Sequence, residues 1–143
     1  MVSTFLYYHL FTCEAQSKLG MVEGGLLKLL CDIISSPVRS VALRQQASKS
    51  LASLAANSSI AVRTRMVETQ TFIPTLKTCL SDPDDQMAIN GAWCVASLAG
   101  GDRDSLLLEG GIVIALSEAA IRANIVVQRE ACRAIAMLSA KRM

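Results

Sequence analysis

The chain has 143 residues, of which 52% are hydrophobic but only 4% aromatic, and its formal net charge is +2. This length can bury a substantial core, and the composition favours stacked helices in which small and branched aliphatic side chains interdigitate. The small net charge gives no support for nucleic-acid binding. The longest apolar runs are interrupted by charged residues such as Lys28, Asp32, Glu109 and Glu118, which argues against a membrane-spanning segment.

The first part of the chain alternates helical stretches with short turns. We interpret residues 1–13 as the end of a partial helical unit. Residues 14–22 predict a short helix and residues 26–34 a compact apolar one, and Pro37 in the following turn prevents a helix from continuing. Residues 40–55 then predict a longer amphipathic helix.

The same order of short, compact and long helices recurs twice. The predicted helices of the second and third units span residues 59–67, 72–80, 85–99, 104–108, 112–122 and 125–140. Two series of equivalent residues confirm one period, since Leu54 to Leu98 is 44 residues, Leu98 to Leu138 is 40, and Glu68 to Glu109 is 41. A period near forty residues predicts an α-helical repeat array. We place the repeats at about residues 14–57, 58–101 and 102–143, in a single domain spanning residues 1–143.

Two motifs carry a family resemblance. The first motif resembles the start of the second helix of the armadillo repeat, and it occurs as EGGLLKLL at residues 23–30 and as EGGI at residues 109–112. The second motif resembles the third helix of that repeat, nearest the importin-α and β-catenin type, and it occurs as NGAWCVASLAGG at residues 90–101. The resemblance implies an all-α, right-handed solenoid of about three three-helix repeats plus a partial N-terminal repeat. It also implies that the third helices line a concave groove that binds extended peptides, often through a Trp and an Asn four residues later.

This sequence keeps only part of that binding pattern. Trp93 matches the Trp, but Ser97 stands where the Asn would be, and no regular Trp and Asn ladder is present. The resemblance therefore does not extend to binding of nuclear-localisation signals. The groove residues that it implies are instead mostly cations and amides: Arg44, Gln45, Lys49, Gln86, Asn90, Trp93, Ser97, Arg129 and Arg133. Such side chains suit an acidic or phosphorylated extended segment.

Each of these residues also has a purely structural interpretation. Trp93 could pack between adjacent third helices, and the cations could form an ordinary solvated face. Asp82, Asp84 and Asp85 lack the further oxygen ligands and the closing Glu of a calcium loop, so we predict that they cap the following helix.

The sequence offers no catalytic, metal or cofactor site. His9 is the only histidine, and the sequence shows no nucleophile or acid that would pair with it as a general base. No catalytic set of nucleophile, base and oxyanion-stabilising group can therefore be assembled. Five cysteines match no metal motif, and with no recognisable signal peptide they predict a reducing intracellular location, cytoplasmic or nuclear.

Three functional hypotheses follow. The leading one is a non-enzymatic scaffold or adaptor that binds a protein or peptide segment, possibly acidic, in the third-helix groove. The second is a segment of a larger protein that stacks on further repeats or self-associates through uncapped ends. That hypothesis expects five exposed apolar residues: Phe5, Leu6, Phe11, Ile135 and Met137. The third is RNA binding, against which the low charge and the single groove aromatic argue.

Overall fold

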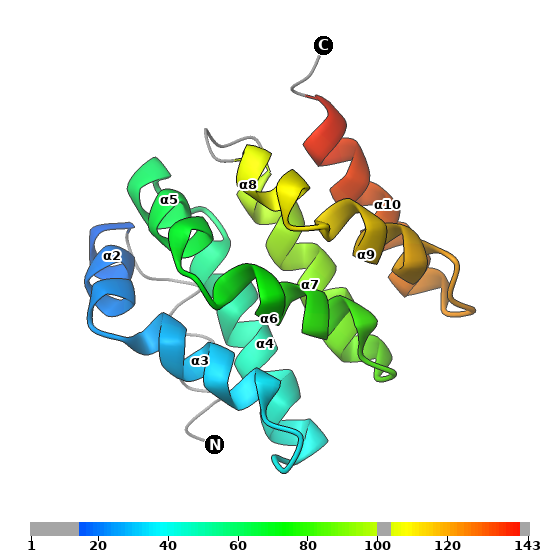
Figure 1. Cartoon of the computed structure of the whole chain (residues 1–143), viewed down its shortest axis with the longest axis horizontal. Coiled ribbons are helices and arrows are strands. Elements are labelled where there is room, and N and C mark those ends of the chain that lie inside the picture. Colours follow the sequence, from blue (N-terminus) through cyan, green and yellow to red (C-terminus); the bar gives the residue numbers. More distant parts are fainter. Residues whose placement is uncertain (1–14, 100–103, 141–143) are drawn as a thin grey trace.

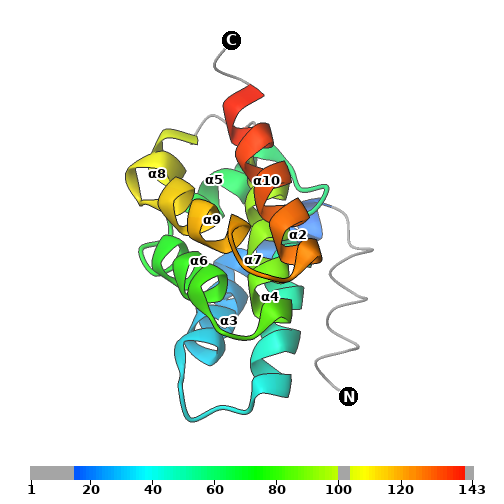
Figure 2. The same ribbon diagram turned by 90° about the vertical axis from the view of Figure 1, so that its right-hand side faces the viewer.

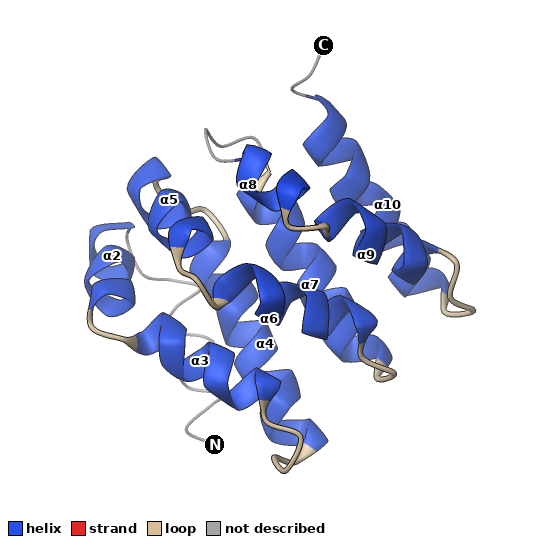
Figure 3. Ribbon diagram, in the orientation of Figure 1, coloured by secondary structure: helices blue, strands red, loops and turns tan. Residues whose placement is uncertain are grey.

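The computed structural model describes residues 15–99 and 104–140. Within these ranges every element is a helix or a turn, and no strand is present (Figure 3). The predicted partial repeat at residues 1–13, with Phe5, Leu6, His9 and Phe11, lies outside the described residues. The helices are α2 (Ala15–Glu23), α3 (Leu26–Ser35), α4 (Val41–Ala55), α5 (Ile60–Glu68), α6 (Phe72–Ser81), α7 (Asp85–Leu98), α8 (Asp104–Glu109), α9 (Ile112–Ala120) and α10 (Ile125–Ala140).

The helices form layers that run along the repeat direction (Figures 1 and 2). The long helices α4, α7 and α10 pack side by side in one layer. A second layer of α3, α6 and α9 packs against them, and the short helices α2, α5 and α8 precede the members of that layer. The α-helical repeat array predicted from the period, and the all-α solenoid that the resemblance implies, are therefore confirmed.

Local sequence signals explain where the helices begin. The side chains of Ser40, Ser59 and Asp84 accept hydrogen bonds from backbone N–H groups three residues later, and so cap α4, α5 and α7. Asn124 does the same for α10. The left-handed backbone at Gly111, with φ of 82°, turns the chain from α8 into α9, a conformation that glycine adopts at little steric cost.

Two predicted helices are slightly too long. The third-unit compact helix, expected to reach residue 122, ends at Ala120, because the backbone N–H of Arg122 bonds the carbonyl of Ala119 only three residues back. The second-unit long helix ends at Leu98 rather than residue 99. All other predicted ends in the described ranges lie within one residue of the observed ends.

One continuous apolar core runs through the three units. It includes Leu27 and Ile34 from the first unit, Phe72 and Met87 from the second, and Leu116 from the third, all essentially inaccessible to solvent. Because each unit buries its apolar face against the next, the third helices are held in fixed register. That register positions the side chains considered next.

Candidate functional site on the third-helix face

The middle of α7 presents Trp93 between two open hollows on the third-helix face. We call the first, of about 340 Å³, the arginine hollow; its described lining residues are Ala56, Asn57, Arg63, Trp93, Ala96, Ser97, Ala99, Arg133 and Met137. We call the second, of about 270 Å³, the amide hollow; its described lining residues are Lys49, Gln86, Ile89, Asn90, Trp93, Glu130 and Arg133. Trp93 and Arg133 line both hollows, and Trp93 also packs partly against the core.

The structure brings together most of the residues that the sequence places in a groove. Six line one or both hollows: Lys49, Gln86, Asn90, Trp93, Ser97 and Arg133. Three line neither: Arg44, Gln45 and Arg129. Trp93 therefore combines the two interpretations of its role, as a packed residue and as an accessible one.

Arg44 and Gln45 connect the first unit to the turn before α7. Nη2 of Arg44 lies 2.6 Å from Oδ2 of Asp82, and its Nε donates to the carbonyl of Ile34 at 3.0 Å. Nε2 of Gln45 donates to Oδ2 of Asp84 at 2.9 Å. Both side chains thus form hydrogen bonds within the protein, at the edge of the layer where the third helices begin.

Asn90 is buried although it lines the amide hollow. Its Nδ2 donates to the hydroxyl of Ser48 at 2.8 Å and to the carbonyl of Gln45 at 3.3 Å, and its Oδ1 accepts from Gln86 at 2.9 Å. The amide therefore ties α7 to α4, as a satisfied buried polar group does. It forms part of the floor of the hollow.

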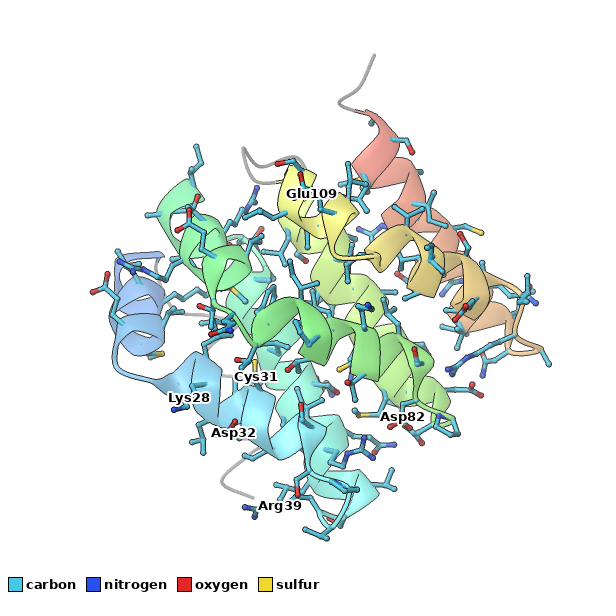
Figure 4. All side chains as sticks on the ribbon, in the orientation of Figure 1. Lys28, Cys31, Asp32, Arg39, Asp82 and Glu109 are labelled. Carbon is cyan, nitrogen blue, oxygen red and sulfur yellow. The ribbon has the colours of Figure 1, made fainter. Side chains whose placement is uncertain are left out.

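The acidic turn before α7 links all three units. Asp84 caps α7, as predicted, and Oδ1 of Asp82 accepts from the backbone N–H of Asp84 at 2.9 Å. Asp85 makes contacts that the sequence did not predict: Oδ2 accepts from Nδ2 of Asn124 at 3.0 Å, and Oδ1 lies 3.6 Å from Nη1 of Arg122. Figure 4 labels Asp82 at this turn. Among the residues that the structure describes, no three acidic, histidine or cysteine side chains are arranged to hold a metal ion.

Two charged residues near Trp93 were missed by the sequence reasoning. Glu130 is only 18% exposed at its side chain, and its carboxylate lies 3.4 Å from Arg133 and 3.7 Å from the exposed Arg129. Arg63 reaches the arginine hollow from the short helix α5. Glu130 could have been found from its spacing to Arg133 on α10, but no local signal predicts the position of Arg63.

Three of the four described cysteines are buried in the core, and Cys132 is exposed. Burial raises the pKa of Cys79 to about 12 and also raises the pKa values of Cys31 and Cys94. These three thiols act as small apolar side chains. The apolar helical stretch around Cys132 predicts the same role for that residue, but its exposure shows that this prediction is wrong.

Comparisons with known proteins agree on the fold. A scan against protein-family models and a search of curated proteins gave no match. Among solved structures, a designed armadillo repeat protein in complex with the peptide (KR)4 matches with a TM-score of 0.81 at 20% identity, over 94% of this chain and 55% of that one. Two crystal structures of engineered proteins match at 20% identity with TM-scores of 0.84 and 0.82, over 96% and 94% of this chain and 54% and 55% of theirs.

The chain therefore has an armadillo-like repeat fold, and it spans about half the length of the solved structures that it matches. None of the helices in residues 15–99 and 104–140 is both long and apolar enough to cross a membrane.

Proposed function

We propose that this protein is a non-enzymatic interaction scaffold that binds an extended partner segment across its third-helix face. The observation that carries this proposal is the pair of hollows that share Trp93 and Arg133. Two adjacent hollows suit two side chains of one extended segment, and a half-buried Trp between them is a typical anchor for such contacts. The packed repeats hold the surface rigid, so binding would require little ordering of the scaffold.

The partner that we propose is acidic. The designed armadillo repeat neighbour is in complex with a peptide of Lys and Arg. Here the two hollows include Lys49, Arg63 and Arg133, against one carboxylate, Glu130, among their described lining residues. Guanidinium groups bind carboxylates and phosphates through paired, charge-assisted hydrogen bonds. The charge of this face thus favours a partner of the opposite charge to (KR)4.

The proposal can be tested with peptides selected from a random phage-displayed library against the whole chain. We expect Trp93→Ala and Arg133→Glu each to raise the Kd of the selected peptides about tenfold or more, because each removes a central contact. Fluorescence polarisation measures the Kd, and circular dichroism should show unchanged helicity. The matched controls are Ile121→Ala and Arg39→Glu, which alter exposed residues away from both hollows. Failure to select any peptide, or equal affinity in all four variants, would contradict the proposal.

A second candidate function, stacking on a further repeat or a second copy, is favoured by the apolar and small side chains that the third unit exposes. Ile114, Ile121 and Ile125 are 67%, 83% and 76% exposed. Cys132 and Ala136 on α10 are exposed, whereas the equivalent residues of α7, forty positions earlier, are buried. Of the residues that this hypothesis named, Met137 is 42% exposed but lines the arginine hollow, and Ile135 is only partly buried against the core.

A further inference from the structure

Arg63 is a partly buried cation whose interactions in the described part of the chain do not account for its burial. Its Nε is buried without a hydrogen-bond partner, and its side chain makes no ion pair with any described residue. A buried donor without an acceptor costs free energy, so it calls for a functional or structural reason. Arg63 also lines the arginine hollow, so other atoms of this side chain border an open space.

A capping role at the end of α4 does not explain Arg63. The last carbonyl groups of that helix already have donors: Nζ of the buried Lys18 lies 3.0 Å from the carbonyl oxygen of Ser53 and 2.6 Å from that of Ala56. The hydroxyl of Ser58 donates to the carbonyl of Ala55 at 2.6 Å. A cation at a helix C-terminus is favourable, and here Lys18 supplies it.

The arginine hollow differs from the surroundings of the other partly buried arginines in the acidic groups that it contains. Arg44 faces Asp82, and Arg122 faces Asp85, each on the acidic turn before α7. Arg63 and Arg133 instead line a hollow whose described lining residues include no carboxylate, because Glu130, the partner of Arg133, lines the other hollow. The two arginines thus bring positive charge to a space that has no carboxylate among its described lining residues, and Glu130 pairs with Arg133 from the side of the other hollow.

We propose that the arginine hollow binds the phosphate of a phosphorylated serine or threonine in the extended partner segment. This rests on the proposed function and adds the chemical identity of one bound side chain. A phosphate monoester carries nearly two negative charges and three acceptor oxygens, enough for the guanidinium groups of Arg63 and Arg133 together. The hydroxyl of Ser97 and the amide of Asn57 line the same hollow and offer further donors. Trp93 and Met137 form apolar walls for the neighbouring backbone.

The phosphate site can be tested without a known partner. We would titrate N-acetyl-O-phosphoserine methylamide into the whole chain and follow the arginine Nε–H signals by NMR. We expect saturable shifts of the Arg63 and Arg133 signals, while those of Arg39 and Arg65 stay in place. The unphosphorylated serine compound should leave all four signals unchanged. Absence of a saturable shift at Arg63 would overturn the inference.

A second experiment separates this inference from the proposed function. Octapeptide libraries with a fixed central phosphoserine, aspartate or serine would be compared for binding to the whole chain. We expect phosphoserine to give about tenfold tighter binding than serine, with aspartate between them. Arg63→Gln should remove this preference, and Arg65→Gln, on the same helix with the same loss of charge, should keep it.

The outcomes of the two experiments are distinct. Binding that is lost in Trp93→Ala but shows no phosphoserine preference overturns the phosphate site and leaves the scaffold function standing. NMR shifts at Arg63 without binding of any library leave a phosphate site in the arginine hollow, but overturn the scaffold function and the extended segment that was to carry the phosphate. Arg63→Gln should also leave the midpoint of thermal unfolding unchanged, since no partner is lost. A decrease as large as that of Arg44→Gln, which loses the contact with Asp82, would show that Arg63 is structural and overturn the inference.

Discussion

Arginine side chains in this protein differ in what they face. Arg44 is 15% exposed and reaches a carboxylate that is 10% exposed, and Nη2 of Arg122 donates to the carbonyls of Leu80 and Asp82. Partly buried pairs of this kind are costly to break, because removing one partner leaves the other charge without compensation. Arg63 has no such partner among the described residues, so the same residue type stabilises the fold in one place and lines the proposed phosphate site in another.

The buried thiols give a prediction for single residues. Burial raises the pKa of Cys79 to about 12, so at about pH 8 its reactive thiolate is present in roughly one molecule in ten thousand. We expect iodoacetamide to alkylate Cys132 in the folded protein far faster than Cys31, Cys79 or Cys94. Peptide mass mapping after timed quenching measures each rate. In concentrated urea all four should react alike, and fast labelling of Cys79 in the folded protein would contradict the packing described above.

The contact between α6 and α7 depends on a residue without a side chain. A Cβ atom added at Gly91 would lie 2.9 Å from Cβ of Cys79 and 3.4 Å from two side-chain carbons of Leu80. Cβ of Cys79 is fixed by its own backbone, so the helices would have to move apart. The small residues of α7 therefore set the distance between the two layers in the second unit.

We expect Gly91→Ala to lower the free energy of unfolding by about 1–3 kcal/mol, because this overpacking outweighs the gain in helix propensity. Urea unfolding followed by circular dichroism measures the change. Gly20→Ala is the matched control: it also lies within a helix, but no described atom lies within 4 Å of the added Cβ. That control should be neutral or stabilising by up to about 1 kcal/mol. Equal effects at the two positions would show that α6 and α7 do not approach this closely.

Across the three units, the two edges of the third-helix layer have different chemistry. Where α4 and α7 begin, the arginine and amide side chains pair with the acidic turn. Where α4 and α7 end, the arginine hollow opens between them and α10. The third unit also exposes Ile114, Ile121 and Ile125, none of which is among the described lining residues of the two hollows. Binding of a segment and stacking of a further unit would therefore use different surfaces and can be separated experimentally.

If the exposed apolar side chains of the third unit stack on a second copy, the mass of the particle should rise with protein concentration. Light scattering coupled to size-exclusion chromatography measures that mass. We expect Ile121→Asp combined with Ile125→Asp to abolish the rise, because charges at these exposed positions oppose apolar burial. Val38→Asp, which alters a side chain 90% exposed in the first unit, is the control and should behave as the parent. A constant monomer mass in the parent would argue against self-association.

The sequence alone was sufficient for the helices, their order and the repeat period. Pro37 and the glycines before α9 act on the chain within a few residues, and apolar periodicity is set within single helices, so these signals can be read locally. The predicted groove positions of Trp93 and Arg133 came instead from the resemblance to the third helix of the armadillo repeat, once the repeats were aligned.

Only the tertiary structure distinguishes the polar residues that hold the units together from those that remain accessible. The pair of Arg44 with Asp82 joins residues 38 positions apart, as does the contact of Lys18 with Ala56. The burial of Asn90 against Ser48 spans 42 positions. Such contacts depend on how one unit packs on the next, which a local pattern cannot specify. The unpartnered Arg63 became visible for the same reason: a missing contact can be recognised only when the surrounding side chains are in place.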